Sequence, residues 1–174
     1  MSNRKLYLAG PLFGLADRVH NLMLARELTI LGYEVILPQI EGEKFIVKGK
    51  PDIKAICEDC RSRAMTCDVL VANIDGTDAD SGTAVEIGLA VATGIPVVIC
   101  VRTDFRTDMD KEVGVNGMLV IGDIECVYLP AFVNSLSEIP EAYQYLAISI
   151  RNADHAGQWK ARCRIMGSRV KQGG

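Results

Sequence analysis

The sequence predicts an α/β fold: one doubly wound domain with a five-stranded, mainly parallel sheet and helices on both faces. Three observations support this prediction. Strand-like and helix-like segments alternate three times in succession, and parallel strands need such crossovers. The 174 residues are 49% hydrophobic and 24% charged, enough for a buried core in one domain. Aromatic residues make up only 6%, a balance typical of layered α/β proteins.

Apolar spacing, together with glycine and proline at segment ends, defines the predicted elements. Short apolar runs predict strands, and apolar residues at every third or fourth position predict helices. Gly10 and Pro11 stop the first strand, Gly32 caps the first helix and Gly94 stops the third. In chain order the prediction is strand 5–9, helix 17–31, strand 33–38, helix 51–65, strand 68–74, helix 82–93, strand 95–101, a fifth strand at 118–121 or 125–129, and a closing helix at 137–150.

The charge of the chain is uneven. The net charge is −3, but residues 151–174 hold six basic residues against Asp154 alone, so this segment carries +5 and residues 1–150 carry −8. We therefore predict a domain over 1–150 and a basic C-terminal tail over 151–174 that is mobile or contacts another subunit. An acidic main body argues against a nucleic-acid polymer as the principal ligand.

No segment predicts membrane insertion or export. No uninterrupted apolar run reaches the ~18 residues of a membrane span. The first apolar run is short and contains Gly10 and Pro11, as in a strand rather than a signal peptide. We therefore expect a cytoplasmic protein with reduced cysteines. Cys57 and Cys60 form a CxxC pair, but no second pair follows, so ordinary helix cysteines are favoured over a zinc or redox site.

The predicted topology places a ligand crevice before any chemistry is considered. In the flavodoxin-like strand order 2-1-3-4-5, the crevice opens at the carboxyl ends of strands 1 and 3, where the winding reverses. The residues after Ala9 and after Ile74 are therefore expected to face each other. The loop after Ile74 lacks both GxGxxG and the Walker-type GxxxxGK motif, and its three aspartates would repel an anion. We predict a neutral, hydroxyl-rich ligand.

Glu86 is the leading catalytic candidate. It is the only charge between Asp80 and Arg102, on a helix so apolar that we expect it to be buried. A lone carboxylate there is costly to desolvate unless it is partnered, so Glu86 is either a satisfied structural acid or a catalytic one. Its place near the helix N-terminus favours catalysis. Tyr7 either packs against the sheet or hydrogen-bonds Glu86 across the crevice, and Asp80 is either a turn acid or a ligand.

Three segments resemble the nucleoside 2-deoxyribosyltransferase family. They are residues 7–13 (YLAGPLF), 67–73 (CDVLVAN) and 80–88 (DSGTAVEIG), in the same order along the chain. The resemblance runs from residue 5 to about residue 148 and implies a flavodoxin-like subunit that transfers 2-deoxyribose between bases with retention. It further implies nucleosides and free nucleobases as partners, no cofactor or metal, and a homo-oligomer of two or more subunits.

The resemblance also implies roles for single residues. Glu86 would be the nucleophile that attacks the anomeric carbon, and Tyr7 would orient it. Asp80 would accept a hydrogen bond from the sugar 5′-hydroxyl, and Asn116 is similar to an amide that a neighbouring subunit contributes to the same sugar. The matching motifs add two substrate-binding glycines, Gly10 and Gly82.

The acid that protonates the leaving base is not where the family places it. The family has this acid eight residues ahead of the position of Asp68, and that offset falls on Cys60 here. We predict Asp59 for this step, one position earlier, with Glu58 as a second candidate. Gln39, after the second strand, either reads the base edge or is a solvated loop residue.

Two other functions stay open at this stage. Related hydrolases cleave nucleoside 5′-monophosphates and tend to have serine where Asp80 stands, because a carboxylate repels a phosphate. Asp80 therefore favours nucleosides, although Ser81 or Thr83 provides a hydroxyl for a phosphate at the helix N-terminus. A non-catalytic nucleotide-binding module would explain Cys60 at the acid position.

Overall fold

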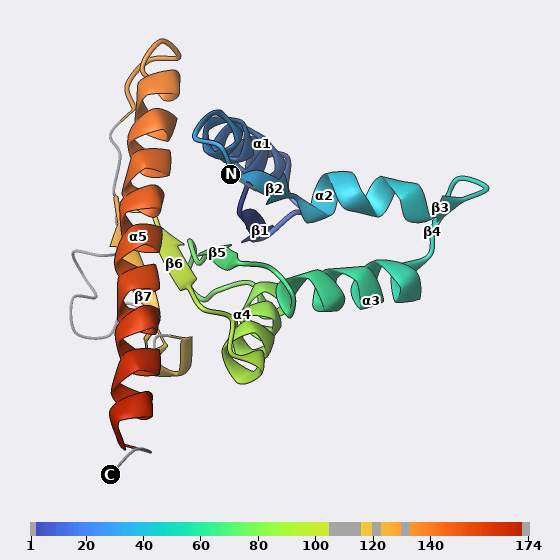
Figure 1. Cartoon of the computed structure of the whole chain (residues 1–174). Helices are drawn as coiled ribbons and strands as arrows, with labels where there is room; N and C mark the ends of the chain where they lie inside the picture. The colour runs from blue at the N-terminus through green and yellow to red at the C-terminus, as the bar shows by residue number, and fades with distance from the viewer. Residues whose placement is uncertain (1–2, 105–115, 120–122, 130–132, 172–174) are drawn as a thin grey trace.

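The sheet has the predicted topology. A computed structural model describes residues 3–104, 116–119, 123–129 and 133–171, with side chains up to residue 162 (Figure 1). Its main sheet has five parallel strands in the order β2-β1-β5-β6-β7, which is the flavodoxin-like order 2-1-3-4-5. The strands are β1 Lys5–Ala9, β2 Glu34–Ile36, β5 Val69–Asn73, β6 Val98–Arg102 and β7 Glu125–Tyr128.

Helices cover both faces of this sheet (Figure 1). One face packs against α1 (Leu15–Ile30) and α5 (Ile139–Lys171), and the other against α3 (Ile53–Ala64) and α4 (Ser81–Thr93). An arm projects from the second layer; it consists of α2 (Pro38–Glu41), the 3-10 turn η1 (Gly42–Phe45) and the antiparallel pair β3 (Ile46–Val47) and β4 (Lys50–Pro51). Within the described ranges, no helix is long and apolar enough to cross a membrane.

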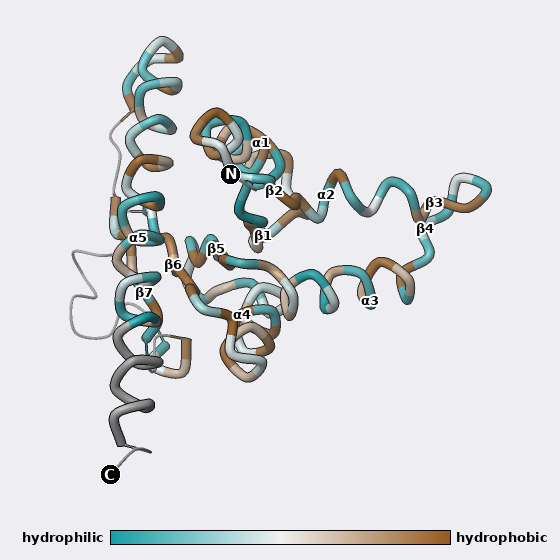
Figure 2. The backbone as a smooth tube through the Cα atoms, in the orientation of Figure 1, coloured by the Kyte–Doolittle hydropathy of each residue, from teal (hydrophilic) through white to brown (hydrophobic). Residues whose placement is uncertain are grey.

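Side chains of the central strands alternate between the two layers. Leu6 and Leu8 belong to the core formed with α1 and α5, whereas Tyr7 and Ala9 belong to the core formed with α3 and α4. Figure 2 shows the hydrophobic run along β6 and the mixed hydropathy of α5. Because strand residues alternate, the Tyr7 side chain points toward the layer that contains Glu86.

The closing helix is longer than predicted. The sequence predicts a helix that ends at residue 150, but α5 continues to Lys171. Asp154, 1% exposed, accepts hydrogen bonds from Arg4 Nη2 at 2.9 Å and from the Tyr33 hydroxyl at 2.8 Å. The predicted end is wrong because contacts with residues far away in the sequence, among them these buried hydrogen bonds and the packing of Gly157 against Val97, hold this part of the helix against the domain. Contact with another subunit stays a prediction.

Smaller differences have local causes. β2 ends before Pro38 because this proline starts α2, where its missing N–H costs nothing. The β3 and β4 pair is absent from the prediction. The fifth strand predicted at 125–129 is confirmed, while the alternative at 118–121 begins in a 3-10 turn, η3 (Gly117–Leu119), and then leaves the described residues.

Candidate active site

The carboxyl ends of β1 and β5 lie side by side, as the topology predicts. Ala9 of β1 is in register with Ala72 of β5. A Cβ atom on Gly10 would lie 3.3 Å from the Asn73 Cβ and 3.4 Å from Asn21 Oδ1. The chain therefore passes close to its neighbours at this edge, and a glycine suits the approach.

Tyr7 and Glu86 meet on the α3 and α4 side of this edge. The Tyr7 hydroxyl donates a hydrogen bond to Glu86 Oε1 at 2.6 Å. Tyr7 is fully buried in β1, and Glu86 is half-buried in the second turn of α4. The predicted hydrogen bond is confirmed, whereas the catalytic roles stay predictions. Among the described residues, Glu86 Oε2 has no donor, so this oxygen is available to a ligand.

The surroundings of Glu86 raise the pKa of its carboxyl group to near neutral pH. Burial raises the pKa of Glu86 to about 7, although the hydrogen bond from Tyr7 lowers it, and the charge of Asp80 raises it further. Burial, and then the charge of Glu86, also raise the pKa of Tyr7, so the phenol keeps its proton. A carboxylate that is ionised near pH 7 but weakly solvated is suited to act as a nucleophile.

Asp80 is the N-cap of α4. Its Oδ2 accepts hydrogen bonds from the Thr83 backbone N–H at 3.0 Å and from Thr83 Oγ1 at 3.2 Å. Gly82, in the first turn, is exposed, and a Cβ there would lie 3.1 Å from Asp80 Oδ2. The cap thus fixes the Asp80 carboxylate near Glu86 and engages one oxygen, while Oδ1 has no donor among the described residues.

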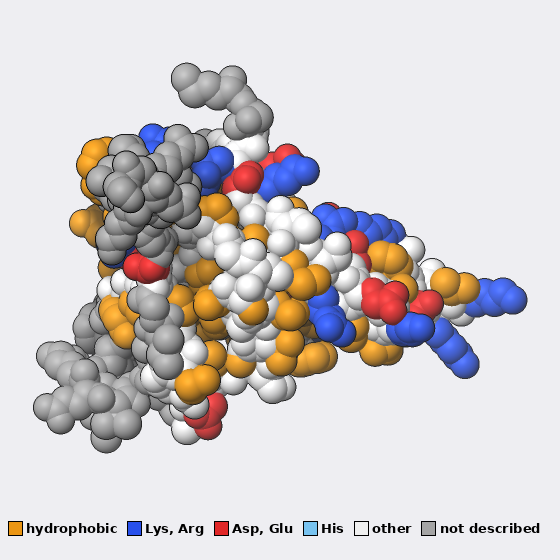
Figure 3. Space-filling model, turned by 60° about the horizontal axis from the view of Figure 1, so that its bottom comes forward, with side chains coloured by type: hydrophobic (Ala, Val, Ile, Leu, Met, Phe, Trp, Pro, Cys, Tyr) orange, Lys and Arg blue, Asp and Glu red, His pale blue; other side chains and the backbone are white. Residues whose placement is uncertain are grey.

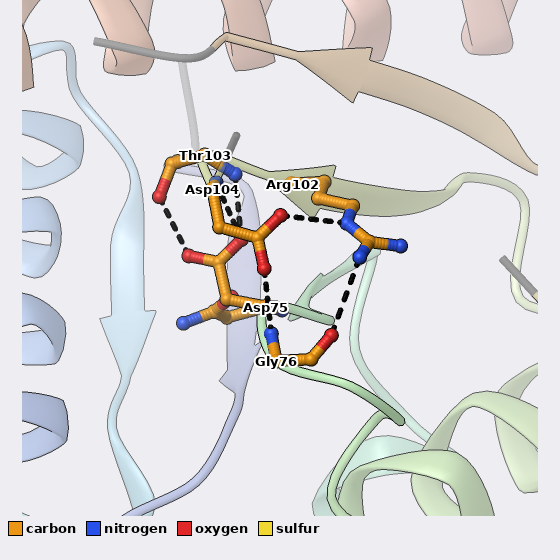
Figure 4. Close-up of polar contacts among 6 residues, drawn as sticks. Asp75, Gly76, Arg102, Thr103 and Asp104 are labelled. Atoms are coloured by element: carbon orange, nitrogen blue, oxygen red, sulfur yellow. Dashed lines mark hydrogen bonds and ion pairs between the residues drawn. The ribbon is translucent and has the colours of Figure 1, made fainter. Parts of the chain in front are cut away.

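The loop that carries Asp80 is tied to the end of β6 (Figure 4). Asp75 accepts hydrogen bonds from the Thr103 backbone N–H and hydroxyl, each at 2.6 Å. Arg102, 3% exposed, donates to Asp104 Oδ1 at 2.8 Å and to the Gly76 carbonyl at 3.2 Å. The sequence singled out neither Asp75 nor Thr103. The available signal was that each of these polar residues follows one of two neighbouring parallel strands.

Helix α3 presents Cys60, not Asp59, to the Tyr7 side chain. Cys60 packs against the core cluster that contains Tyr7 and interacts with its hydroxyl, and burial raises the pKa of the thiol. Asp59 instead forms an ion pair with Arg63 at 2.7 Å, and Arg63 also pairs with Glu41 at 2.9 Å. The described contacts do not bring Asp59 to the Tyr7–Glu86 pair, so its role as the acid stays a prediction.

Three other candidates lie outside this pair. Gln39 uses both ends of its amide: Oε1 accepts from Asn21 Nδ2 at 3.2 Å, and Nε2 donates to the Arg18 carbonyl at 3.1 Å. Asn116 is exposed, and its side-chain oxygen accepts from a backbone N–H in its own turn. Glu58 is exposed on α3. The substrate contacts of Gln39 and Asn116 and the role of Glu58 as a second candidate acid stay predictions.

The CxxC cysteines are free thiols. Cys57 is exposed and Cys60 is half-buried on α3. Across the part of the chain that the structure describes, no group of three His, Cys, Asp or Glu side chains is arranged to hold a metal ion.

Several solved structures share this architecture. A conserved protein from Enterococcus faecalis V583 is 28% identical, with a TM-score of 0.57 over 83% of this chain and 99% of that chain. A 2-deoxyribosyltransferase from Leishmania mexicana is 20% identical, with a TM-score of 0.56 over 83% and 97%. A 2-deoxyribosyltransferase from Bacillus psychrosaccharolyticus is 22% identical, with a TM-score of 0.56 over 78% of this chain and 96% of that chain. The last two show the shared fold.

Sequence comparison identifies the family. Comparison with curated proteins gives no match. A family model described as nucleoside 2-deoxyribosyltransferase matches residues 6–118, a stretch that contains Tyr7, Asp80 and Glu86. Because this match spans well over half of the sequence and includes the crevice residues, the chain belongs to the nucleoside 2-deoxyribosyltransferase family.

Proposed function

We propose that this protein transfers 2-deoxyribose between nucleobases by a retaining double displacement. Glu86 attacks C1′ of the nucleoside, the C1′–N bond breaks, and its electron pair leaves with the base, which takes up a proton. An incoming base then attacks C1′ and releases the Glu86 carboxylate. The observation that supports this proposal most directly is the 2.6 Å hydrogen bond from Tyr7, which fixes the carboxylate at the crevice and leaves Oε2 for the sugar.

Asp80 selects an unphosphorylated sugar in this proposal. Its capping bonds to Thr83 engage Oδ2, and Oδ1 accepts from the 5′-hydroxyl. A 5′-phosphate would meet the negative charges of both Asp80 and Glu86. This repulsion is the physical reason for nucleosides rather than nucleotides as substrates.

Protonation of the leaving base is assigned to Asp59. A general acid contributes roughly 10²–10⁴-fold to a rate, so Asp59→Asn should reduce kcat by at least that lower factor. A loss below tenfold would assign Asp59 to the ion-pair network with Arg63 and Glu41 alone. Arg63→Gln is the control for the effect of breaking the network without removing the acid.

We further propose a cytoplasmic homo-oligomer in which Asn116 of a neighbouring copy reaches the sugar. The face turned forward in Figure 3 is largely uncharged at its centre, where hydrophobic and other uncharged groups mix, and charged side chains gather on the arm. On α4, Val85 and Val91 are 57% and 46% exposed. These exposed apolar side chains on the helix that carries Glu86 support contact with another subunit.

The test is base exchange from deoxyadenosine to a second free base. We expect transfer without much net hydrolysis, and a loss of at least ~10³-fold in kcat/KM for Glu86→Ala with the fold retained by circular dichroism. Glu43→Ala, an exposed glutamate on the arm, is the matched control. Near-normal turnover by Glu86→Ala would refute the nucleophile.

Two other results would redirect the assignment. Hydrolysis of deoxynucleoside 5′-monophosphates without transfer would support the related hydrolase function. Binding of nucleosides without turnover would support a non-catalytic module. Intact-mass detection of a deoxyribosyl adduct on the wild-type protein, absent from Glu86→Gln, would support the covalent step.

A further inference from the structure

Two cysteines lie opposite each other on neighbouring strands of the main sheet. Cys100 of β6 and Cys126 of β7 are partners in the parallel register of these strands, and both are free thiols. Opposed residues of parallel strands point to the same face of a sheet. Cys100 belongs to the core of the α3 and α4 layer, so both thiols lie on that face.

The separation of the two strands suits a disulfide. Neighbouring strands lie about 4.7–4.9 Å apart. The Cα atoms of bridged cysteines are usually about 4.4–6.8 Å apart, so the register of Cys100 and Cys126 brings their backbones within range. Cys67, the other buried cysteine, lies before β5 and outside the paired registers of the sheet.

The two thiols differ in their access to solvent. Cys126 is exposed, whereas Cys100 is 1% exposed and its Sγ donates to the Leu119 carbonyl at 3.6 Å. Burial raises the pKa of Cys100 to about 12, and the charge of Cys126 raises it further. An oxidant dissolved in water therefore meets Cys126 first, and Cys100 is placed to react with the oxidised sulfur.

We propose that Cys126 and Cys100 form a reversible disulfide when hydrogen peroxide reaches this part of the sheet. The Cys126 thiolate attacks an oxygen of the peroxide, the O–O bond breaks, and Cys126 becomes a sulfenic acid. The Cys100 sulfur then attacks the Cys126 sulfur, and the S–O bond breaks as the S–S bond forms. In total the two thiols lose two electrons and two protons, and the peroxide leaves as two water molecules.

Proximity offsets the weak acidity of Cys100. With a pKa of about 12, roughly one thiol in 10⁵ is ionised at pH 7. Well-oriented neighbouring groups react with effective molarities of about 10⁵–10⁸ M. The Cys100 thiol thus competes with a fully ionised thiol present in solution at about 1 M or more, which exceeds the concentration of any cellular thiol.

The sheet makes this disulfide easy to reduce. The Cβ atoms of bridged cysteines are about 3.5–4.5 Å apart, less than the spacing of the strands. β7 is the last strand in the order of the described sheet, so it can move toward β6, but the bond that forms is strained. Strained disulfides are the labile ones. Oxidation also withdraws the Cys100 hydrogen from the Leu119 carbonyl, so β6 loses this contact with η3.

The test is peptide mapping of the full chain after treatment with hydrogen peroxide at about pH 8.5, where ordinary thiols begin to ionise. Trypsin should leave residues 64–102 and 112–151 joined by a disulfide. Cys126 is the only cysteine of the second fragment, whereas the first contains Cys67 and Cys100. A protease that cleaves before aspartate separates these two, because Asp75 and Asp80 lie between them.

Variants provide the second arm of the test. Cys100→Ser, whose hydroxyl still donates to the Leu119 carbonyl, should lower the yield of joined fragments at least tenfold. Cys67→Ser should leave the yield unchanged, as should Cys57→Ser, which removes an exposed thiol from α3. Reduced glutathione in excess should lower the oxidised level at least tenfold, because a strained bond is readily exchanged.

Four results would overturn the proposal. They are unlinked fragments in the folded wild type, a link to Cys67 instead of Cys100, a covalent dimer joined through two copies of Cys126, and a link that excess glutathione leaves intact. Glu86→Ala should form the same disulfide as the wild type. Loss of transfer activity and loss of this disulfide are therefore separate outcomes, so failure of one proposal is distinguishable from failure of the other.

Discussion

Three influences determine the pKa of Glu86, and they do not all act in the same direction. Burial and the charge of Asp80 favour the protonated form of Glu86, and the Tyr7 hydroxyl favours the ionised form. Two of these influences come from single side chains, Tyr7 and Asp80, and can be removed by substitution. Substitutions at Tyr7 and Asp80 should therefore shift the pH dependence of activity in opposite directions.

Replacing Tyr7 by phenylalanine should move the acid limb of the kcat/KM profile to higher pH. The phenol stabilises ionised Glu86, so its removal raises the pKa of that carboxyl further above about 7. At pH 6 we expect about a tenfold loss of kcat/KM, the size of one hydrogen bond to a charge. Tyr33→Phe, which removes a hydroxyl bound to Asp154 instead, is the control and should leave the profile unchanged.

Asp80→Ser should move the same limb to lower pH. The substitution removes a negative charge that raises the pKa of Glu86, and serine still caps α4. The ratio of 5′-monophosphate to nucleoside turnover should rise about tenfold as the repulsion of phosphate disappears. Asp78→Ser, an exposed acid in the same loop, should change neither quantity. An unaltered substrate ratio in Asp80→Ser would contradict the proposed selectivity.

The Tyr7–Glu86 contact was predictable, whereas the side chains of α3 and α1 were not. Topology alone brings the first strand to the helix after the third. Neighbouring positions on a helix differ by about 100°, and the sequence does not define the rotation that turns Cys60 rather than Asp59 toward Tyr7. The burial of Asn21, which is 4% exposed and donates to Gln39, was not predicted. A single amide on an amphipathic helix is usually a solvent-facing residue.

At the scale of elements, helix α5 packs by close backbone contact. A Cβ on Gly157 would lie 2.9 Å from Val97 Cγ1. Gly157→Ala should therefore destabilise the protein by about 1–3 kcal/mol in urea unfolding, since α5 and Val97, the residue before β6, must separate to admit the methyl group. Gly88→Ala, with open space around its Cβ, should instead stabilise α4 by about 0.5–1 kcal/mol.

The order of the elements was predictable because the spacing of apolar residues distinguishes strands from helices. The ends of the elements were harder to predict. The closing helix was expected to stop where its apolar spacing ends, at residue 150. It continues because Asp154 and Gly157 make specific contacts with Arg4 and Val97. Such contacts involve residues far away in the sequence, so no local window reveals them.

For the molecule as a whole, the half-buried carboxylate of Glu86 lowers stability at and above neutral pH. Burial raises the pKa of Glu86 to about 7 in the fold from the ordinary glutamate value of 4.5, so the folded state holds more protons between these values. Stability therefore falls as pH rises from 4.5 to 7. Glu86→Gln, which keeps an acceptor for Tyr7, should raise Tm at pH 8 by roughly 5–10 °C and much less at pH 4.5. Glu43→Gln is the control; equal gains at both pH values would contradict this account.

The bond between Arg4 and Asp154 joins residues 150 positions apart. A nascent chain on the ribosome thus contains both Tyr7 and Glu86 long before the partner of Arg4 has been synthesised. Contacts of such high sequence separation slow folding. Until translation reaches Asp154, the Arg4 guanidinium and the Tyr33 hydroxyl lack the carboxylate that binds both of them in the finished fold.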